Sequence, residues 1–126
     1  MEFKKVKREM HVGANPGTKY MAQIVRGETI DFNAMADMIE KSSTVSKADV
    51  LAVLEQMQTT ALWMMQAGHS VRFGDLGIFT PTAKVKAVDT EEKVTADTIQ
   101  RIYTRFTPSV EMKQKMKSSK IIWKDK

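Results

Sequence analysis

Cysteine is absent from the 126-residue chain, and proline and glycine are scarce, with three and six residues. Without cysteine the chain can form neither a disulfide nor a thiolate metal site. No apolar run approaches the ~20 residues that a membrane-spanning helix needs. The charged N-terminus, Met1–Arg8, is not followed by the apolar segment of a signal peptide. We therefore expect a cytoplasmic protein with no membrane partner.

Catalytic and metal-binding patterns are also missing. The two histidines, His11 and His69, lie far apart and have no partner at ligand spacing. The chain contains no nucleophile elbow and no glycine-rich loop that could cradle a phosphate. Asp75 lies in a glycine-bracketed bend without an acid–base partner beside it, so a solvated turn residue is the better interpretation. We expect no enzyme, no metal, no cofactor and no small-molecule substrate.

The charge is positive overall and unevenly distributed. The formal net charge is +5, and it divides into +4 over residues 1–26, −4 over 27–69, +1 over 70–105 and +4 over 106–126. Such separation favours a polyanion at the basic parts of the chain. The alternative is that the lysine-rich ends only keep a small protein soluble.

The length and the 42% hydrophobic content predict one domain with a modest core. The ten methionines fill irregular core gaps or line an adaptable interface. Alternating apolar and polar residues over Glu2–Met10 and Thr18–Arg26 predict two strands. The turn residues of Val12–Gly17 join them into a hairpin. The apolar cluster Ile121–Trp123 predicts a last strand that pairs with this hairpin.

Two helices are expected in the acidic part of the chain. Asp31 can cap a helix over Phe32–Ser42, and Ser46, with an acidic residue three positions later, opens a second helix over Lys47–Ala67. The apolar arc of the second helix is broader than one neighbour needs. A dimer contact would cover the extra side, with Trp63 near it; the alternative is that the chain's own sheet and hairpin cover it.

A glycine-bracketed corner follows the second helix. Gly74 and Gly77 can adopt the positive φ angles of a tight bend. Beyond the corner, Phe79–Val88 predicts a strand in which Pro81 indicates an edge position or a bulge. Val94–Phe106 predicts the returning strand, and the polar tip Asp89–Lys93 joins the two into a ribbon.

The ribbon is the segment expected to carry a function. Ile99, Arg101, Tyr103 and Arg105 should face one way, and Phe106 the other. Most of the ribbon has no apolar cover, and an ordered segment without burial costs conformational entropy with little return. The alternative is a ribbon packed on the N-terminal hairpin. After it, Thr107–Val110 opens a short helix with proline near its first turn.

Two stretches resemble the bacterial histone-like HU and integration host factor family. Val71–Phe79, which reads Val-Arg-Phe-Gly-Asp-Leu-Gly-Ile-Phe, is similar to that family's apolar strand and its Gly-Phe-Gly-x-Phe corner. Arg105–Met112 is similar to its closing phenylalanine and short C-terminal helix. The order of elements agrees over residues 29–117. The hairpin of residues 1–28 and the strand and basic tail of residues 118–126 are additional and resemble a longer HU-like branch.

The resemblance implies an α+β fold with a helical hairpin, an antiparallel sheet and a β-ribbon arm, assembled as an intertwined homodimer. HU and integration host factor are architectural proteins of the DNA minor groove. The implied partner is double-stranded DNA, and the implied location is the nucleoid. By position, the implied dimer core is Leu76, Phe79 and Phe106. The implied DNA-binding residues are Arg72, Lys84, Lys86, Lys93, Arg101 and Arg105.

The tip departs from the family pattern because it contains Asp89, Glu91 and Glu92 and has no proline. Carboxylates oppose phosphates, and no wedge is present to stabilise a kink that costs about 1–6 kcal/mol. We expect weaker, backbone-directed and sequence-independent DNA binding. The alternative is an HU-like fold used for protein contacts. RNA binding is a weaker third hypothesis, since no aromatic platform for unstacked bases is evident.

Overall fold

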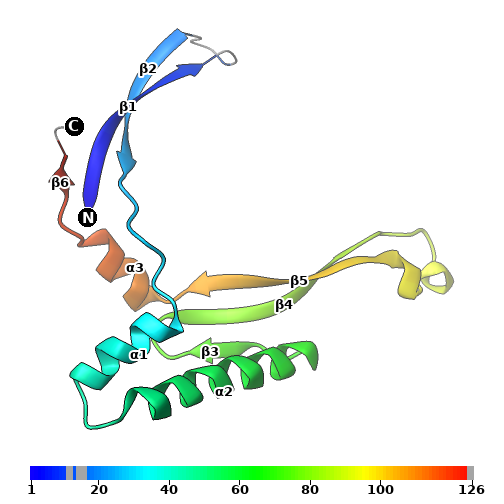
Figure 1. Cartoon of the computed structure of the whole chain (residues 1–126). Helices are drawn as coiled ribbons and strands as arrows, with labels where there is room; N and C mark the ends of the chain where they lie inside the picture. The colour runs from blue at the N-terminus through cyan, green and yellow to red at the C-terminus, as the bar shows by residue number, and fades with distance from the viewer. Residues whose placement is uncertain (11–12, 14–16, 125–126) are drawn as a thin grey trace. The chain divides into compact units, whose positions relative to one another are not determined.

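The computed structural model describes residues 1–10, 13 and 17–124 (Figure 1). The chain forms two compact units, one of residues 1–29 and 116–126 and one of residues 30–115. The predicted turn over Val12–Gly17 lies largely outside the described residues. No helix within the described part is long and apolar enough to cross a membrane.

The first unit is a three-stranded sheet of order β2-β1-β6. Strand β1 (Glu2–Met10) pairs antiparallel with β2 (Gly17–Ile24) and parallel with β6 (Ile122–Trp123). Residues paired directly across two strands project from the same side of a sheet. The hairpin and the pairing of the last strand with it are confirmed.

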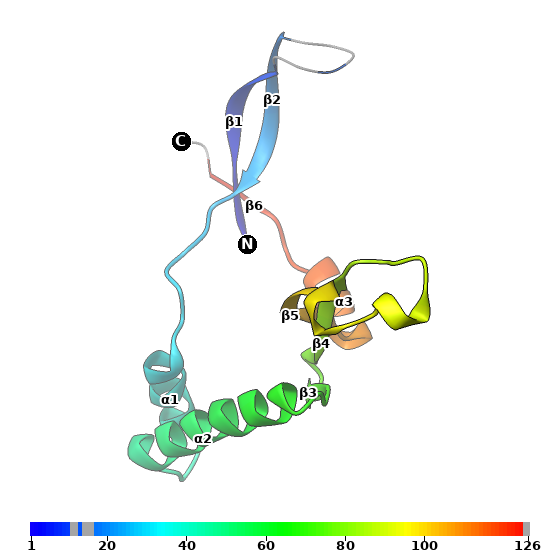
Figure 2. The same cartoon turned by 90° about the vertical axis from the view of Figure 1, so that its right-hand side faces the viewer.

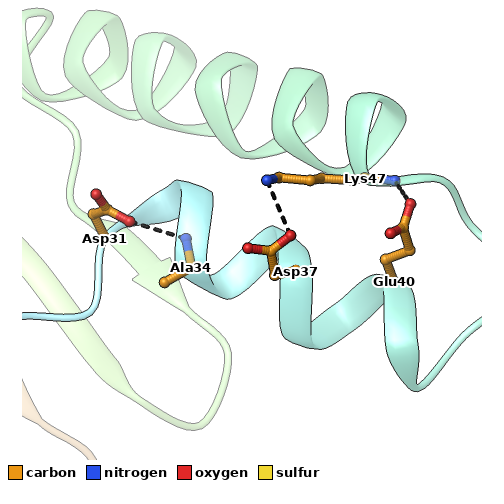
Figure 3. A network of polar contacts seen from close by, with 5 residues as sticks. All are labelled: Asp31, Ala34, Asp37, Glu40 and Lys47. Atoms are coloured by element: carbon orange, nitrogen blue, oxygen red, sulfur yellow. Dashed lines mark hydrogen bonds and ion pairs between the residues drawn. The ribbon is translucent and has the colours of Figure 1, made fainter.

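The second unit begins with two capped helices, α1 (Phe32–Lys41) and α2 (Lys47–Gln66). The Asp31 side chain accepts a hydrogen bond from the backbone N–H of Ala34 at 2.9 Å (Figure 3). Ser46 Oγ accepts from the backbone N–H of Asp49 at 3.3 Å. Each cap satisfies a donor that has no partner inside its helix, so both predicted helix starts are confirmed.

A polar network joins the end of α1 to the start of α2 (Figure 3). Lys47 Nζ lies 2.9 Å from Asp37 Oδ1, and the Lys47 backbone N–H donates to Glu40 Oε2 at 2.6 Å. The ion pair is partly exposed and contributes roughly 0–1 kcal/mol. The second bond satisfies another unpaired donor of α2, so it holds the two helices at the short connection between them.

The second unit continues with a sheet of order β3-β4-β5, formed by Val71–Phe73, Gly77–Val85 and Ile99–Pro108. Strand β3 pairs only with Gly77–Phe79, and β4 and β5 continue past it as a two-stranded ribbon (Figure 1). Pro81 lies beyond the last residue paired with β3, which confirms its predicted edge position. The register shift of β4 falls instead between Lys84 and Val85.

The tip of the ribbon is larger than predicted. Strand β4 ends at Val85 and not at Val88, and β5 begins at Ile99 and not at Val94. Two 3-10 turns lie in this larger tip: η1 (Glu91–Lys93) falls within the predicted polar tip, and η2 (Ala96–Thr98) replaces part of the predicted start of β5. The Thr98 hydroxyl donates to the Thr95 carbonyl at 2.6 Å. Threonine and aspartate side chains bond locally to the backbone and so compete with strand pairing.

The corner between β3 and β4 confirms the role of its two glycines. Gly74 has φ 51° and Gly77 has φ 156°. A Cβ at Gly77 would lie 2.4 Å from the Thr107 carbonyl oxygen and 2.8 Å from the Phe106 ring. At this position a side chain would therefore meet both a strained backbone conformation and a clash with β5.

Ser109 ties the corner to helix α3 (Val110–Lys117). Its backbone N–H donates to the Leu76 carbonyl at 3.0 Å, and its hydroxyl donates to the Asp75 carbonyl. The same hydroxyl accepts from the Met112 N–H at 3.0 Å and caps the helix. Pro108 is the last residue of β5 and lies two residues before α3 begins, so proline is near the first turn of this helix, as predicted.

Little of the described chain is buried. Ala36, Val50 and Ala61 are its buried hydrophobic residues, and no large side chain is completely enclosed. Phe79 contacts the rings of Phe73 and Phe106, with ring centroids 5.2 and 4.8 Å away. Figure 2, which looks along the ribbon from its tip, shows α2 on one side of the sheet. The buried residues lie on α1 and α2 and the three rings on the sheet, so the core is a thin layer shared by the two helices and one side of the sheet.

We predict that Gly77→Ala destabilises the protein by at least about 1–3 kcal/mol, because alanine disfavours this φ and its Cβ would strike β5. Urea unfolding at one fixed protein concentration measures the effect. Gly27→Ala is the matched control, since a Cβ there meets no atom within 4 Å. Equal unfolding midpoints for the two variants would contradict the account of the corner.

Candidate functional site

The register of the second sheet places four predicted cations on one side. Lys84 pairs with Arg101, and Arg105, four residues further along β5, pairs with Thr80 on β4. Arg72 on β3 pairs with Ile78, which has the same orientation as Thr80 and Lys84. We call the side that carries Arg72, Lys84, Arg101 and Arg105 the basic face.

The opposite side of the sheet is apolar near α2. Phe79 and Phe106 are paired there, and Phe73 pairs with Gly77 on the same side. The alternation of a strand thus separates arginine and lysine from phenylalanine across one layer. The alternation predicted for Arg101, Tyr103, Arg105 and Phe106 is confirmed by this register.

The cations of the basic face are exposed, and one of them, Arg101, contacts a neighbouring aromatic ring. The Arg101 guanidinium carbon lies 4.5 Å from the centre of the Tyr103 ring, which is a cation–π contact. Within the described part of the chain, none of the four has a carboxylate partner. Their charge is therefore not neutralised by the protein and is available to an anion. The sequence analysis did not identify Tyr103 as a functional residue. Its position two residues from Arg101 on the predicted strand already indicated that the two side chains share a side.

Lys86 and Lys93 lie apart from the basic face. Lys86 follows β4, and its backbone N–H donates to the Thr98 carbonyl at 2.8 Å. Lys93 ends the 3-10 turn η1, next to Glu91 and Glu92. The register shift after Lys84 ends the regular alternation before either lysine is reached. The structure therefore gathers four of the six predicted cations and leaves two at the ribbon's tip.

An open apolar groove of about 420 Å³ lies beside the phenylalanine side of the sheet. Leu76, Phe79 and Phe106, the three predicted dimer-core residues, all line it. Leu76 is 57% exposed and Leu62 on α2 is 51% exposed. The other lining residues come from α1, α2, β3 and α3: Phe32, Met35, Leu54, Met57, Gln58, Ala61, Met65, Phe73 and Met112. Trp63, also exposed, lies outside this lining.

Two carboxylates meet at the corner. A hydrogen bond with Asp75, and then the repulsion of its charge, raise the pKa of Glu111, with a small addition from desolvation. The protonated form of Glu111 can donate to Asp75, whereas two charged carboxylates repel each other. The described residues contain no cluster of three or more ligands that could hold a metal ion.

Together these features define an HU-like α+β domain, with a helical hairpin, a three-stranded sheet and a corner closed by a short helix. A family model described as "HU domain fused to wHTH, Ig, or Glycine-rich motif" matches residues 1–122. The chain belongs to this family, named HU-HIG.

The fold also matches a solved structure. A crystal structure from Bacteroides vulgatus ATCC 8482, provisionally named as a bacterial DNA-binding protein, aligns with 99% of the chain at a TM-score of 0.62 and 17% identity. The chain spans about half of that protein, 49% of its length. At this identity the match shows the fold. No curated protein sequence matches the chain.

We predict that the stability of Glu111→Gln relative to the wild type increases as the pH rises. The pKa of Glu111 is raised in the folded state, so its favourable contribution is complete below the pKa of the unfolded chain. The wild type loses that contribution as the pH rises through the raised pKa. Glutamine does not titrate, so the variant has no such decrease in stability. Urea midpoints between about pH 4 and pH 7 measure the difference.

Asp75→Asn should reproduce the trend, because it removes the other carboxylate of the pair and keeps the backbone carbonyl that Ser109 contacts. Glu55→Gln, which changes a lone exposed carboxylate on α2, is the control and should not reproduce it. A difference between Glu111→Gln and wild type that stays constant over this pH range would refute the carboxylate pair.

Proposed function

We propose that this protein is a non-catalytic, nucleoid-associated architectural protein that binds double-stranded DNA. It acts as an intertwined homodimer and contacts the DNA backbone and minor groove through a basic saddle and two β-ribbon arms. Its membership in an HU family and the provisional name of its structural relative support DNA as the partner.

One observation carries the proposal: Arg72, Lys84, Arg101 and Arg105 share a side of the sheet and have no carboxylate partner among the described residues. Arginine and lysine that neutralise phosphates release condensed counterions, which favours binding without reading the sequence. Exposed arginine in a narrow minor groove also gains from its negative potential. The basic face has the charge and the extended form for such contacts.

The apolar groove supports the proposed dimer. Exposed apolar residues gathered in one patch mark an interaction surface, and a large one is typical of obligate dimers. Leu62, Leu76 and Phe106 are each between 39% and 57% exposed and line the same groove. A second copy of this chain would cover them, and the two basic faces would then act together.

The tip favours backbone contacts over kinking. Residues 86–98 contain no proline, and Asp89, Glu91, Glu92 and Asp97 outnumber Lys86 and Lys93. Without a wedge between base steps, a sharp kink gains no stacking contact in return for its deformation energy. We propose binding that is largely independent of sequence and positioned by the phosphates.

We predict that Arg101→Gln weakens binding to a short DNA duplex about three- to tenfold at 0.1 M salt, equally for unrelated sequences. The plot of log K against log[salt] should lose roughly one unit of slope for each phosphate contact removed. Fluorescence anisotropy of a labelled duplex measures both quantities. Lys41→Gln, which removes one charge at the end of α1, is the control. A wild-type affinity that does not change with salt would refute phosphate contacts.

We predict that the wild type has twice the mass of one chain in solution and that Leu76→Lys lowers the dimer fraction. In the dimer the second copy covers the groove, so the added lysine charge would be buried there without a partner. Sedimentation equilibrium measures the mass. A dimer whose folding depends on assembly also unfolds at a midpoint that rises with protein concentration. Val110→Lys, at a site 70% exposed and outside the groove, is the control. A monomeric wild type would exclude the intertwined dimer.

A second candidate function is a protein contact made by the ribbon's tip. Val85, Val94 and Ile99 line a hollow of about 670 Å³ there and are each between 48% and 63% exposed. Acidic residues around apolar ones suit a basic protein surface better than DNA. If Lys84→Glu combined with Lys86→Glu left the duplex affinity unchanged, this second function would be favoured.

A further inference from the structure

The first unit carries all its aromatic side chains on one side of its sheet. Phe3 pairs with Ile24 on β2 and with Trp123 on β6, so these three residues form one row across the sheet. Tyr20 pairs with Lys7, which lies four residues from Phe3 on β1 and therefore points to the same side. We call this side the aromatic face; it carries Phe3, Tyr20, Trp123, Lys5 and Lys7, and Glu9 lies at its end beyond the Tyr20 row.

The aromatic face is open. Tyr20 is 73% exposed and Trp123 is 53% exposed, while Phe3 is half-buried between its two neighbours. Buried aromatic residues in a sheet stabilise it by packing, but Tyr20 and Trp123 keep most of their surface in water. These two rings are therefore available to a flat apolar ligand, with Phe3 partly covered beside Trp123.

Positive charge is placed among the rings. Lys5 pairs with Ala22 and lies between the Phe3 row and the Tyr20 row, which are about 13 Å apart along the strands. The whole unit carries ten basic and four acidic residues, a net charge of +6. The opposite side of the sheet also carries cations, Lys4, Arg8 and Lys19, but has Val6 and Met21 in place of aromatic rings, so rings and positive charge occur together only on the aromatic face. The ligand of the aromatic face should therefore combine planar rings with negative charge.

We propose that the aromatic face binds single-stranded nucleic acid. Exposed aromatic side chains in a positively charged groove stack on unpaired bases while lysines contact the backbone. Bases of a duplex are stacked on each other and cannot reach the rings. Two bases would stack at the Phe3–Trp123 row and one at Tyr20, with Lys5 and Lys7 beside the phosphates between them. The site belongs to the N-terminal unit and does not rest on the duplex binding proposed above.

The chain offers an internal reporter for this stacking. It has two tryptophans, Trp63 and Trp123, so Trp63→Phe leaves the tryptophan of the aromatic face as the sole emitter. We expect a single-stranded oligodeoxythymidine or oligouridine to quench this emission, with an affinity that falls as salt rises. Quenching by both oligonucleotides identifies a shared platform, and quenching by one shows which sugar is accepted. Absence of quenching by either, or equal quenching by a duplex, would overturn the proposal.

Variants of the full-length chain then separate stacking from folding. Tyr20→Ala should weaken binding of a labelled single strand about five- to a hundredfold, as expected for the loss of one stacked base, whereas Tyr20→Phe should keep the affinity. Met21→Ala, on the opposite side of the same strand, is the matched control and should have no effect. An equal loss with Met21→Ala, or with Tyr20→Phe, would show that the ring does not stack.

Duplex binding measured on the same preparations distinguishes this site from the basic face. Tyr20→Ala should leave the duplex affinity unchanged, and Arg101→Gln should leave the single-strand affinity unchanged. If Tyr20→Ala reduced both affinities equally, the aromatic face would not be a separate site and the inference would be wrong. A failure of duplex binding alone would refute the proposed function and leave the single-strand result standing.

Discussion

The register between β4 and β5 is the constraint on which the second unit depends. A shift by one residue would exchange every side chain between the two sides of the sheet. In the observed register Phe79 and Phe106 meet on one side, while Lys84 and Arg101 meet on the other. Gly77 maintains this register because only glycine fits its φ and its close approach to Thr107. Burial and charge are thus separated by one layer of backbone.

The same separation leaves exposed groups on both sides of the sheet. Its apolar side is covered by α2 but still borders an open groove, and Ala36, Val50 and Ala61 are the buried hydrophobic residues of the described chain. A small domain with so little buried apolar surface has a small hydrophobic gain to set against the entropy of ordering the chain. The basic side, in turn, has charges without internal partners. The proposed dimer and DNA contacts rest on these exposed groups, one on each side of the sheet.

Much of the fold could be predicted from local chemistry. Asp31 and Ser46 marked the helix starts because each side chain can accept from a backbone N–H in the first turn. Alternation predicted the sides of β5 from Arg101 to Phe106. The strand ends at the tip were predicted wrongly because local threonine hydrogen bonds compete there with pairing. The contacts that hold Ser109 at the start of α3 were not predicted because they come from Asp75 and Leu76, more than thirty residues earlier.

The sequence by itself determined which segments are helices and strands, where the glycines must bend the chain and that basic residues alternate with apolar ones. These features depend on neighbours within a few residues. Only the tertiary structure decided which side chains from different strands lie on the same side of a sheet, because that depends on pairing between distant segments. Phe3 and Trp123 come from opposite ends of the chain and become neighbours only through the parallel pairing of β1 with β6. The aromatic face could therefore not be recognised before the sheet was known.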